Sequence, residues 1–109
     1  MKLVIIESPY SGDIERNVEY ACMCVKDSLL RDEAPFASHL LYTQPSILND
    51  EIEIQRWMGM RAGWEWMRKA NLVAVYMDLG ISKGMEFGIA KAEFYGVPVE
   101  YRKLKPIVV

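Results

Sequence analysis

The chain has 109 residues, 51% of them hydrophobic and 26% charged, and a formal net charge of -2. These values predict one domain with a modest core, and the lack of a basic stripe argues against a nucleic-acid partner. Only four apolar residues in a row precede Glu7, too few for a signal peptide or a membrane span. We therefore expect a cytoplasmic protein with no membrane partner.

The first segment, residues 2–7 ("KLVIIE"), is short and β-branched and predicts a buried strand. A turn-rich loop, 8–13, follows, and Asp13 is placed to cap a helix. Apolar residues at helical spacing predict that this helix runs from residue 14 to about residue 31. They are Ile14, Val18, Ala21, Cys22, Val25 and Leu29.

The middle of the chain predicts a second strand and a long helix. Residues 35–41 ("PFASHLL") are mostly apolar and predict the strand, and a loop over 42–50 ends in Asn49 or Asp50 as the next cap. The helix over about 51–69 contains Gly59 and Gly63, each costing about 1 kcal/mol against alanine. Either another backbone or a ligand approaches the helix closely at these glycines, or the helix simply tolerates the cost. Three tryptophans in the same helix indicate core packing or an intersubunit surface: Trp57, Trp64 and Trp66.

The last third contains the clearest strand of the sequence, the near-continuous apolar run 71–77. A loop over 78–84 follows, and then a helix over about 84–95 that ends at Gly96. A strand over 97–101 comes next. In the tail, 102–109, residues Ile107 to Val109 are candidates for an edge strand.

The alternation of strands and helices predicts the fold class. It indicates a three-layer α/β/α, flavodoxin-like or Rossmann-like fold with a parallel sheet of four or five strands, in the order 2-1-3-4. Ligands of such sheets bind at the carboxyl ends of the strands, where the strand order reverses. The loops 8–13 and 78–84 follow the two strands at this point, so we expect them to face one crevice.

Both loops carry groups that can hold a polar ligand. Ser8, Ser11 and Ser82 offer hydroxyl groups, and both loops lead into helix N-termini, which attract anions. Lys83 adds a cation. The loops match neither a P-loop nor the dinucleotide glycine fingerprint, so they predict a phosphate or sugar site of another kind.

Several side chains near this crevice allow two interpretations. Asp78 binds the ligand or caps a turn, and Tyr10 binds the ligand or packs the loop. His39, the single histidine, is a hydrogen-bonded core residue or flanks the pocket. Arg16 and Asn17 reach the ligand or face water.

No metal or cofactor site is expected. Cys22 and Cys24 lie two apart in a predicted helix, so they point in different directions and neither pair nor share a metal. A zinc site would combine His39 with scattered carboxylates, and we reject it.

At the level of whole segments, the sequence resembles the nucleoside 2-deoxyribosyltransferase-like superfamily, in particular a small uncharacterised branch of phage and bacterial type. The similarity covers residues 2–101. It rests on "VIIESPYSGDIERNVEYA" (4–21), "PFASHL" (35–40), "ANLVAVYMD" (70–78), "SKG" (82–84) and "GIAKAEFYGVPV" (88–99).

The resemblance implies chemistry at an N-glycosidic bond. A glutamate on the helix after the third strand attacks the anomeric carbon, and a second acid helps the base to leave. Glu86 copies the family's Glu-x-Gly, but spacings counted from Gly84 and from Gly96 both place the nucleophile at Gly88. Glu86 lies two residues earlier, a rotation of about 200° around a helix. The second acid falls near Gly63, and glycine at both positions would enlarge the pocket.

The sequence leaves three functions open. The chain is a nucleoside or nucleotide N-glycosidase or deoxyribosyltransferase with Glu86 as nucleophile, a non-catalytic nucleotide-binding protein, or an interaction protein that assembles through its tryptophan-rich helix. We expect a homo-oligomer, dimer or higher, because small domains with apolar helix faces often dimerise. The residues predicted to bind the ligand are Ser8, Pro9, Tyr10, Ser11, Gly12, Arg16, His39, Asp78, Ser82, Lys83, Gly84 and Gly88.

Overall fold

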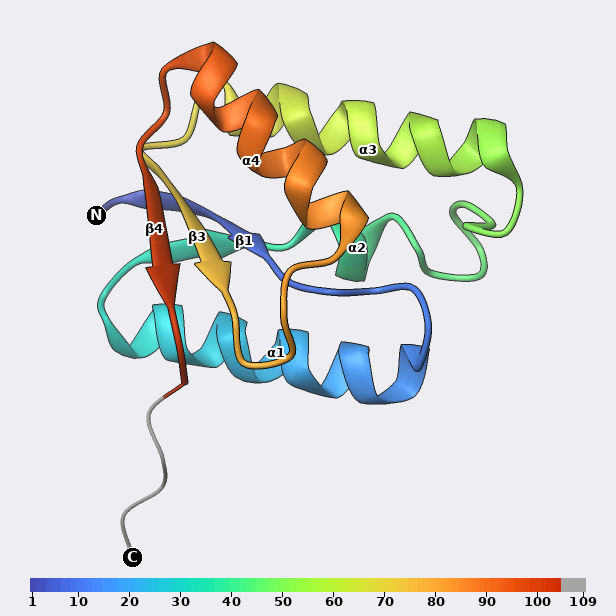
Figure 1. Ribbon diagram of the computed structural model, residues 1–109, viewed down its shortest axis with the longest axis horizontal. Coiled ribbons are helices and arrows are strands. Elements are labelled where there is room, and N and C mark those ends of the chain that lie inside the picture. The colour runs from blue at the N-terminus through green and yellow to red at the C-terminus, as the bar shows by residue number, and fades with distance from the viewer. Residues whose placement is uncertain (105–109) are drawn as a thin grey trace, which may run out of the picture.

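The computed structural model of the protein describes residues 1–104 and has three layers, with a parallel sheet between α1 on one face and α3 and α4 on the other (Figure 1). The predicted edge strand over 107–109 lies outside the described residues. Across residues 1–104 no helix has the length and apolar character needed to cross a membrane. The elements are β1 (Leu3–Glu7), α1 (Ile14–Leu30), β2 (Ala34–Phe36), α2 (Ser38–Leu41), α3 (Glu53–Met67), β3 (Leu72–Tyr76), α4 (Lys83–Tyr95) and β4 (Val99–Arg102).

The sheet confirms the predicted fold class and strand order. Four parallel strands lie in the order β2-β1-β3-β4, and β1 pairs with both of its neighbours, Ile5 lying opposite Phe36 on one side and Val73 on the other. All five residues of β3 are buried, as expected for a strand with helices on both faces. The reversal of strand order therefore falls between β1 and β3.

Each face of the sheet has its own apolar core, because successive side chains of a strand point to opposite faces. Val4 and Ile6 of β1 join the core beneath α1, together with Tyr20 and Cys24 of that helix. Ile5 joins the other core, with residues of β3, α3 and α4. Two residues beyond Ile5, the side chain of Glu7 follows it to the α3 and α4 face.

The ends of two helices were predicted correctly. The Asp13 carboxylate accepts a hydrogen bond from the Arg16 backbone N–H at 3.2 Å and caps α1. Gly96 ends α4 in the left-handed conformation, with a φ of 72° that a side chain rarely adopts. Ser82 caps the start of α4 by accepting a hydrogen bond from the Met85 N–H.

The buried stripe of α1 differs from the prediction. Ile14, Cys22 and Leu29 are exposed, and the buried residues are Asn17, Tyr20, Ala21, Cys24 and Ser28. Polar residues can take inward positions here because their donor groups have partners. The Asn17 Nδ2 donates to the carbonyls of Tyr10 and Ser11, and the Ser28 hydroxyl donates to a carboxylate.

The predicted second strand, 35–41, is wrong in its second half. Only Ala34 to Phe36 pair with β1, and the chain then turns at Ala37 into the short helix α2. His39 therefore lies on a helix. Packing against α3 selects this conformation, because α2 fits closely over Gly63.

The predicted cap of α3 is also wrong. Neither Asn49 nor Asp50 caps the helix, which begins at Glu53 after Ile52 without a side-chain cap. The Asn49 side chain accepts a hydrogen bond from the Glu51 N–H, so it stabilises the turn before the helix instead.

Candidate functional site

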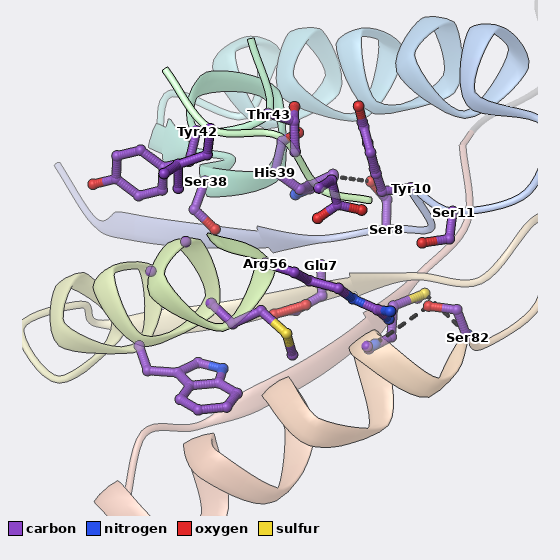
Figure 2. Close-up of a pocket in the computed structure, with 18 of the residues that line it drawn as sticks. Glu7, Ser8, Tyr10, Ser11, Ser38, His39, Tyr42, Thr43, Arg56 and Ser82 are labelled. Atoms are coloured by element: carbon purple, nitrogen blue, oxygen red, sulfur yellow. Dashed lines mark hydrogen bonds between the residues drawn. The ribbon is translucent and has the colours of Figure 1, made fainter. Parts of the chain in front are cut away.

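A cavity of about 180 Å³ lies at the carboxyl edge of the sheet, between α2, α3 and the start of α4 (Figure 2). The loops after β1 and β3 both contribute to its lining, as the topology led us to expect. Ser8, Tyr10 and Ser11 come from the first loop. The second contributes Ser82, and the first residues of α4 continue the lining with Lys83 and Gly84.

The opposite wall comes from a part of the chain in which the sequence pointed to His39 and to the helix glycines Gly59 and Gly63. The segment from α2 to α3 contributes polar groups and apolar side chains to one continuous surface. Figure 2 shows the Arg56 side chain extending across the cavity in the direction of Ser82. The apolar part of the lining consists of Ile5, Leu48, Met60, Trp64, Met67 and Met85.

A hydrogen bond between Ser8 and His39 joins the end of β1 to α2. The Ser8 Oγ and the His39 Nε2 are 2.7 Å apart, and Ser8 is 5% exposed. Burial lowers the pKa of His39 to about 4, so the imidazole is neutral at pH 7. The hydroxyl of Thr43 donates to the His39 carbonyl and helps to hold α2 in place. His39 is hydrogen-bonded and half-buried, and it lines the cavity, as the second sequence alternative expected.

Glu7, the last residue of β1, was not predicted as a site residue, and it lines the cavity beside Ser8. Burial raises the pKa of its carboxyl group from 4.5 to about 8, and no partner offsets that cost. A carboxyl group with this pKa is largely protonated at pH 7. Such shifts concentrate at functional sites.

The Glu7 carboxyl fills the space that a side chain at position 88 would occupy. An ideal Cβ on Gly88 would lie 2.6 Å from Cδ and 2.9 Å from Oε2 of Glu7. These distances are far below ordinary van der Waals contact. Gly88 on α4 is therefore the residue that lets the Glu7 side chain lie where it does.

The same relation holds at Gly63, where a Cβ would lie 2.6 Å from Oγ and 2.9 Å from Cβ of Ser38. The expectation that glycine at 63 and 88 enlarges the pocket is wrong. The space next to Gly63 contains Ser38, and the space next to Gly88 contains Glu7. The alternatives for Gly63 were a nearby backbone or ligand, or simple tolerance, and the structure instead places the Ser38 side chain against it.

Six predicted site residues do not line the cavity: Pro9, Gly12, Arg16, Asp78, Glu86 and Gly88. Arg16 and Glu86 are exposed, Glu86 in the first turn of α4. Asp78 accepts hydrogen bonds from the Tyr20 hydroxyl at 2.5 Å and from the Leu104 N–H at 3.1 Å, so it ties its loop to α1 and to the segment after β4. Asn17, left open between ligand and water, is buried and holds the first loop.

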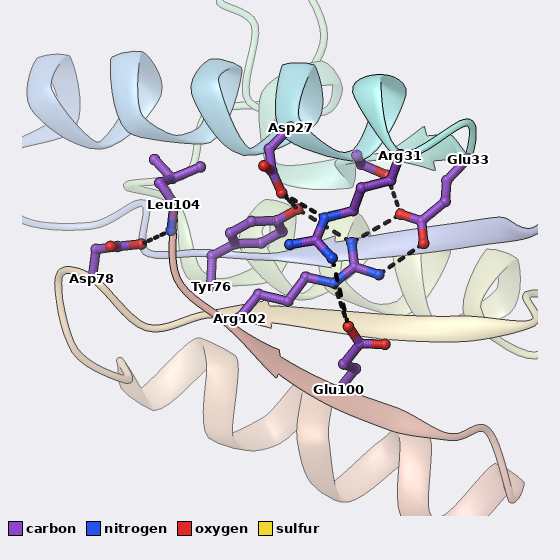
Figure 3. Close-up of polar contacts among 9 residues, drawn as sticks. Asp27, Arg31, Glu33, Tyr76, Asp78, Glu100, Arg102 and Leu104 are labelled. Carbon is purple, nitrogen blue, oxygen red and sulfur yellow. Dashed lines mark hydrogen bonds and ion pairs between the residues drawn. The ribbon is translucent and has the colours of Figure 1, made fainter. Parts of the chain in front are cut away.

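A second polar cluster lies on the α1 face of the sheet, away from the cavity (Figure 3). Arg102 of β4 donates two hydrogen bonds to the Glu33 carboxylate, both at 2.8 Å. Tyr76 donates to Asp27 at 2.7 Å, and Arg102 also contacts Glu100. We call these five residues the α1-side network. Every one of its carboxylates has a donor, so it binds the layers together.

The network and its surroundings shift the pKa values of two of its carboxyl groups, Glu33 and Asp27, in the direction of the charged form. The hydrogen bonds from Arg102 hold the pKa of Glu33 below its usual value. Burial alone would raise the pKa of Asp27, but hydrogen bonds from Tyr76 and Arg31 outweigh burial and lower it. Within residues 1–104, no three His, Cys, Asp or Glu side chains gather closely enough to hold a metal ion.

Fold and cavity together define a class: a Rossmann-like α/β/α protein with a cavity at the switch point of its parallel sheet. Within that class, the chain belongs to the family described as "Domain of unknown function (DUF7768)", which matches residues 2–102. No curated protein matches the sequence.

A solved structure with a similar fold is the 2-deoxyribosyltransferase from the psychrotolerant bacterium Bacillus psychrosaccharolyticus. It has a TM-score of 0.64 and 14% sequence identity, over 98% of this chain and 76% of that chain. At this identity the likeness shows a shared fold. The fold implied by the sequence resemblance is therefore correct.

Proposed function

We propose that this protein binds a nucleoside or nucleotide in the switch-point cavity and breaks or transfers its N-glycosidic bond. The observation that carries the proposal is the composition of the cavity lining, in which hydroxyl groups from both loops face an apolar wall. A nucleoside has the same two halves, a hydroxyl-bearing sugar and a flat apolar base.

The cavity lining contains side chains that can bind each half of such a ligand. Trp64 and Met60 offer an apolar surface for a base, and Ser11 and Ser82 offer hydroxyl groups for a sugar. Lys83, at the start of α4, adds a cation beside a helix N-terminus, which suits the phosphate of a nucleotide. The cavity, at about 180 Å³, is smaller than the ~300–1,000 Å³ typical of drug-sized ligands, so it takes one small molecule.

The direct test measures release of free base by chromatography after incubation with ribonucleosides, 2'-deoxynucleosides and their 5'-monophosphates. We expect slow release from at least one member of this panel, and its abolition in Ser11→Trp, which places an indole at the cavity. Ser46→Trp is the matched control, because Ser46 is exposed and does not line the cavity. Equal release by both variants would contradict the assignment to this cavity, and no release by the wild type would contradict the activity.

A second candidate function is non-catalytic binding of a nucleotide, for sensing or sequestering. Glycine at positions 63 and 88, where the resemblance implies carboxylates, favours it. Binding to the folded state alone raises the melting temperature. Stabilisation by a nucleotide without base release would select this function, whereas the absence of any stabilisation across nucleotides would contradict both candidates.

The exposed aromatic side chains of α3 and α4 favour self-association as a further property. Trp57 and Phe87 pack together with ring centroids 5.8 Å apart, yet they are 39% and 43% exposed. We propose that this surface joins copies of the chain into a homo-oligomer. Light scattering tests it directly, with Trp57→Ala expected to lower the measured mass. A monomeric wild type would contradict the proposal.

A further inference from the structure

The carboxyl group of Glu7 combines three features that the proposed reaction leaves without a role. It lines the cavity from the end of β1. It lies between β1 and α4, in space that is free because position 88 is a glycine. It is also adjacent in sequence to Ser8, whose hydroxyl group is hydrogen-bonded to His39. Glu7 is half-buried, and a carboxyl group that stabilised the fold from between two layers would have a hydrogen-bonding partner, as Glu33 has in Ser28 and Arg102. Figure 2 shows the Glu7 side chain among the residues that line the cavity, and no hydrogen-bonding partner is found for it among residues 1–104.

We propose that Glu7 is a catalytic proton donor and that the reaction is hydrolysis of the N-glycosidic bond. This inference rests on the proposed function. In the step, the bond between the anomeric carbon and the base nitrogen breaks, and its electron pair leaves with the base. The base takes the Glu7 proton, a water molecule adds to the anomeric carbon and loses a proton to solvent, and solvent reprotonates Glu7. The products are free base and sugar.

The protonation state of Glu7 supports this role. Burial raises its pKa to about 8, so at pH 7 the group is mostly a neutral acid that can donate, and a general acid is most effective when its pKa is near the working pH. The other titratable or charged groups lining the cavity come from each element around it: Tyr10 after β1, His39 on α2, Tyr42 and Asp50 between α2 and α3, Arg56 on α3, and Lys83 on α4.

The decisive variant is Glu7→Gln, which keeps the shape and neutrality of the protonated acid but has no acidic proton. We expect base release to fall by about 10²–10⁴-fold, the usual contribution of a general acid, while binding of the product base stays unchanged in calorimetry. Glu93→Gln is the matched control, since Glu93 is an exposed glutamate on α4 and should keep wild-type turnover. Wild-type kcat/KM should decline above about pH 8, and the residual activity of Glu7→Gln should not.

The possible outcomes separate this inference from the proposed function. Base release by the wild type that Glu7→Gln retains would overturn the role of Glu7 and leave the function in place. Loss of base binding together with turnover would make Glu7 a binding group and also overturn the role as proton donor. No release by the wild type would overturn both.

A double variant tests the geometry itself. Because the Gly88 Cβ would point into the Glu7 carboxyl, Glu7→Ala combined with Gly88→Glu delivers a carboxyl group to the same region from α4. We expect the double variant to recover part of the activity that Glu7→Ala loses. Turnover no higher than that of Glu7→Ala, in a variant with wild-type circular dichroism, would show that the position of the carboxyl was assigned wrongly.

Discussion

The two polar clusters of this protein, one on each face of the same sheet, differ in how their charges are satisfied. In the α1-side network, Glu33 accepts two hydrogen bonds from Arg102 and one from Ser28. At the cavity, the pKa of Glu7 is raised by burial with nothing to offset it. The first arrangement lowers the pKa of a carboxylate, and the second raises it.

We expect this difference to separate residues that hold the fold from residues that take part in the proposed chemistry. Buried polar groups with all partners in place stabilise one arrangement of the layers. A buried carboxyl group without a partner costs stability, and proteins retain such costs mainly at functional sites. Substitutions in the two clusters should therefore change the free energy of unfolding by different amounts.

The largest effect is expected in the α1-side network. Arg102→Met leaves the Glu33 carboxylate buried without its main donor, and breaking such a pair costs about 3–5 kcal/mol. Denaturant unfolding at pH 7 measures this loss. The control is Arg68→Met, whose partner Glu65 is exposed, and we expect a change of no more than about 0.5 kcal/mol there. A loss at Arg102 as small as at Arg68 would remove the contrast between the clusters.

A smaller effect of opposite sign is expected at the cavity. The folded-state pKa of Glu7 is above its unfolded value, so its contribution to stability is fully present below about pH 4.5 and is lost as the pH rises through about 8. Glu7→Gln removes this dependence. We expect the variant to be more stable than the wild type by about 1–3 kcal/mol at pH 8.5 and equal to it near pH 4.5.

Unfolding at a series of pH values measures the difference, and Glu93→Gln should follow the wild type throughout. The loss of stability at acid pH should be the same in the wild type, Glu7→Gln and Glu93→Gln, because it comes from groups other than Glu7. His39 and Glu33 have folded-state pKa values below their unfolded values, so their contributions are lost as the pH falls. A Glu7→Gln variant that is less stable than the wild type at pH 8.5 would mean that Glu7 is a structural residue.

The smallest effect is expected at the cavity wall, where α2 packs on α3. Gly63→Ala brings a Cβ to within 2.9 Å of the Ser38 Cβ, and we expect a loss of about 1–2 kcal/mol despite the better helix propensity of alanine. Adding Ser38→Gly should restore most of it. Gly59→Ala is the control, because its Cβ would have only the Leu48 Cδ1 at 3.3 Å and the Tyr42 Cβ at 3.5 Å near it. A larger loss of stability in Gly59→Ala than in Gly63→Ala would contradict the conclusion that Gly63 is the more closely packed of the two glycines.

Much of the fold was predictable because the signals are local. The apolar run of β3, the Asp13 cap and the Gly96 stop depend on neighbours in the sequence, and the order of strands follows from their alternation with helices. The same topology placed the loops after β1 and β3 beside one another. Their role in binding a ligand remains a prediction.

The elements that were predicted incorrectly depend on distant contacts. Residues 38–41 are apolar enough for a strand, but packing over Gly63 makes them helical. Glu7 was placed only at the end of the predicted strand 2–7, because its position against Gly88 depends on a residue far away in the chain. A signal was present: Glu7 shares its face with Ile5, and glycine in the interior of a helix indicates close approach of another group.

The sequence by itself determined which segments form the sheet, their order and the edge at which a site can form, since hydrophobic periodicity and turn residues act over short distances. Only the tertiary structure decided which side chain occupies that edge. The burial of Glu7, its raised pKa and its fit against Gly88 are properties of the assembled layers, because a charge is desolvated by everything that surrounds it.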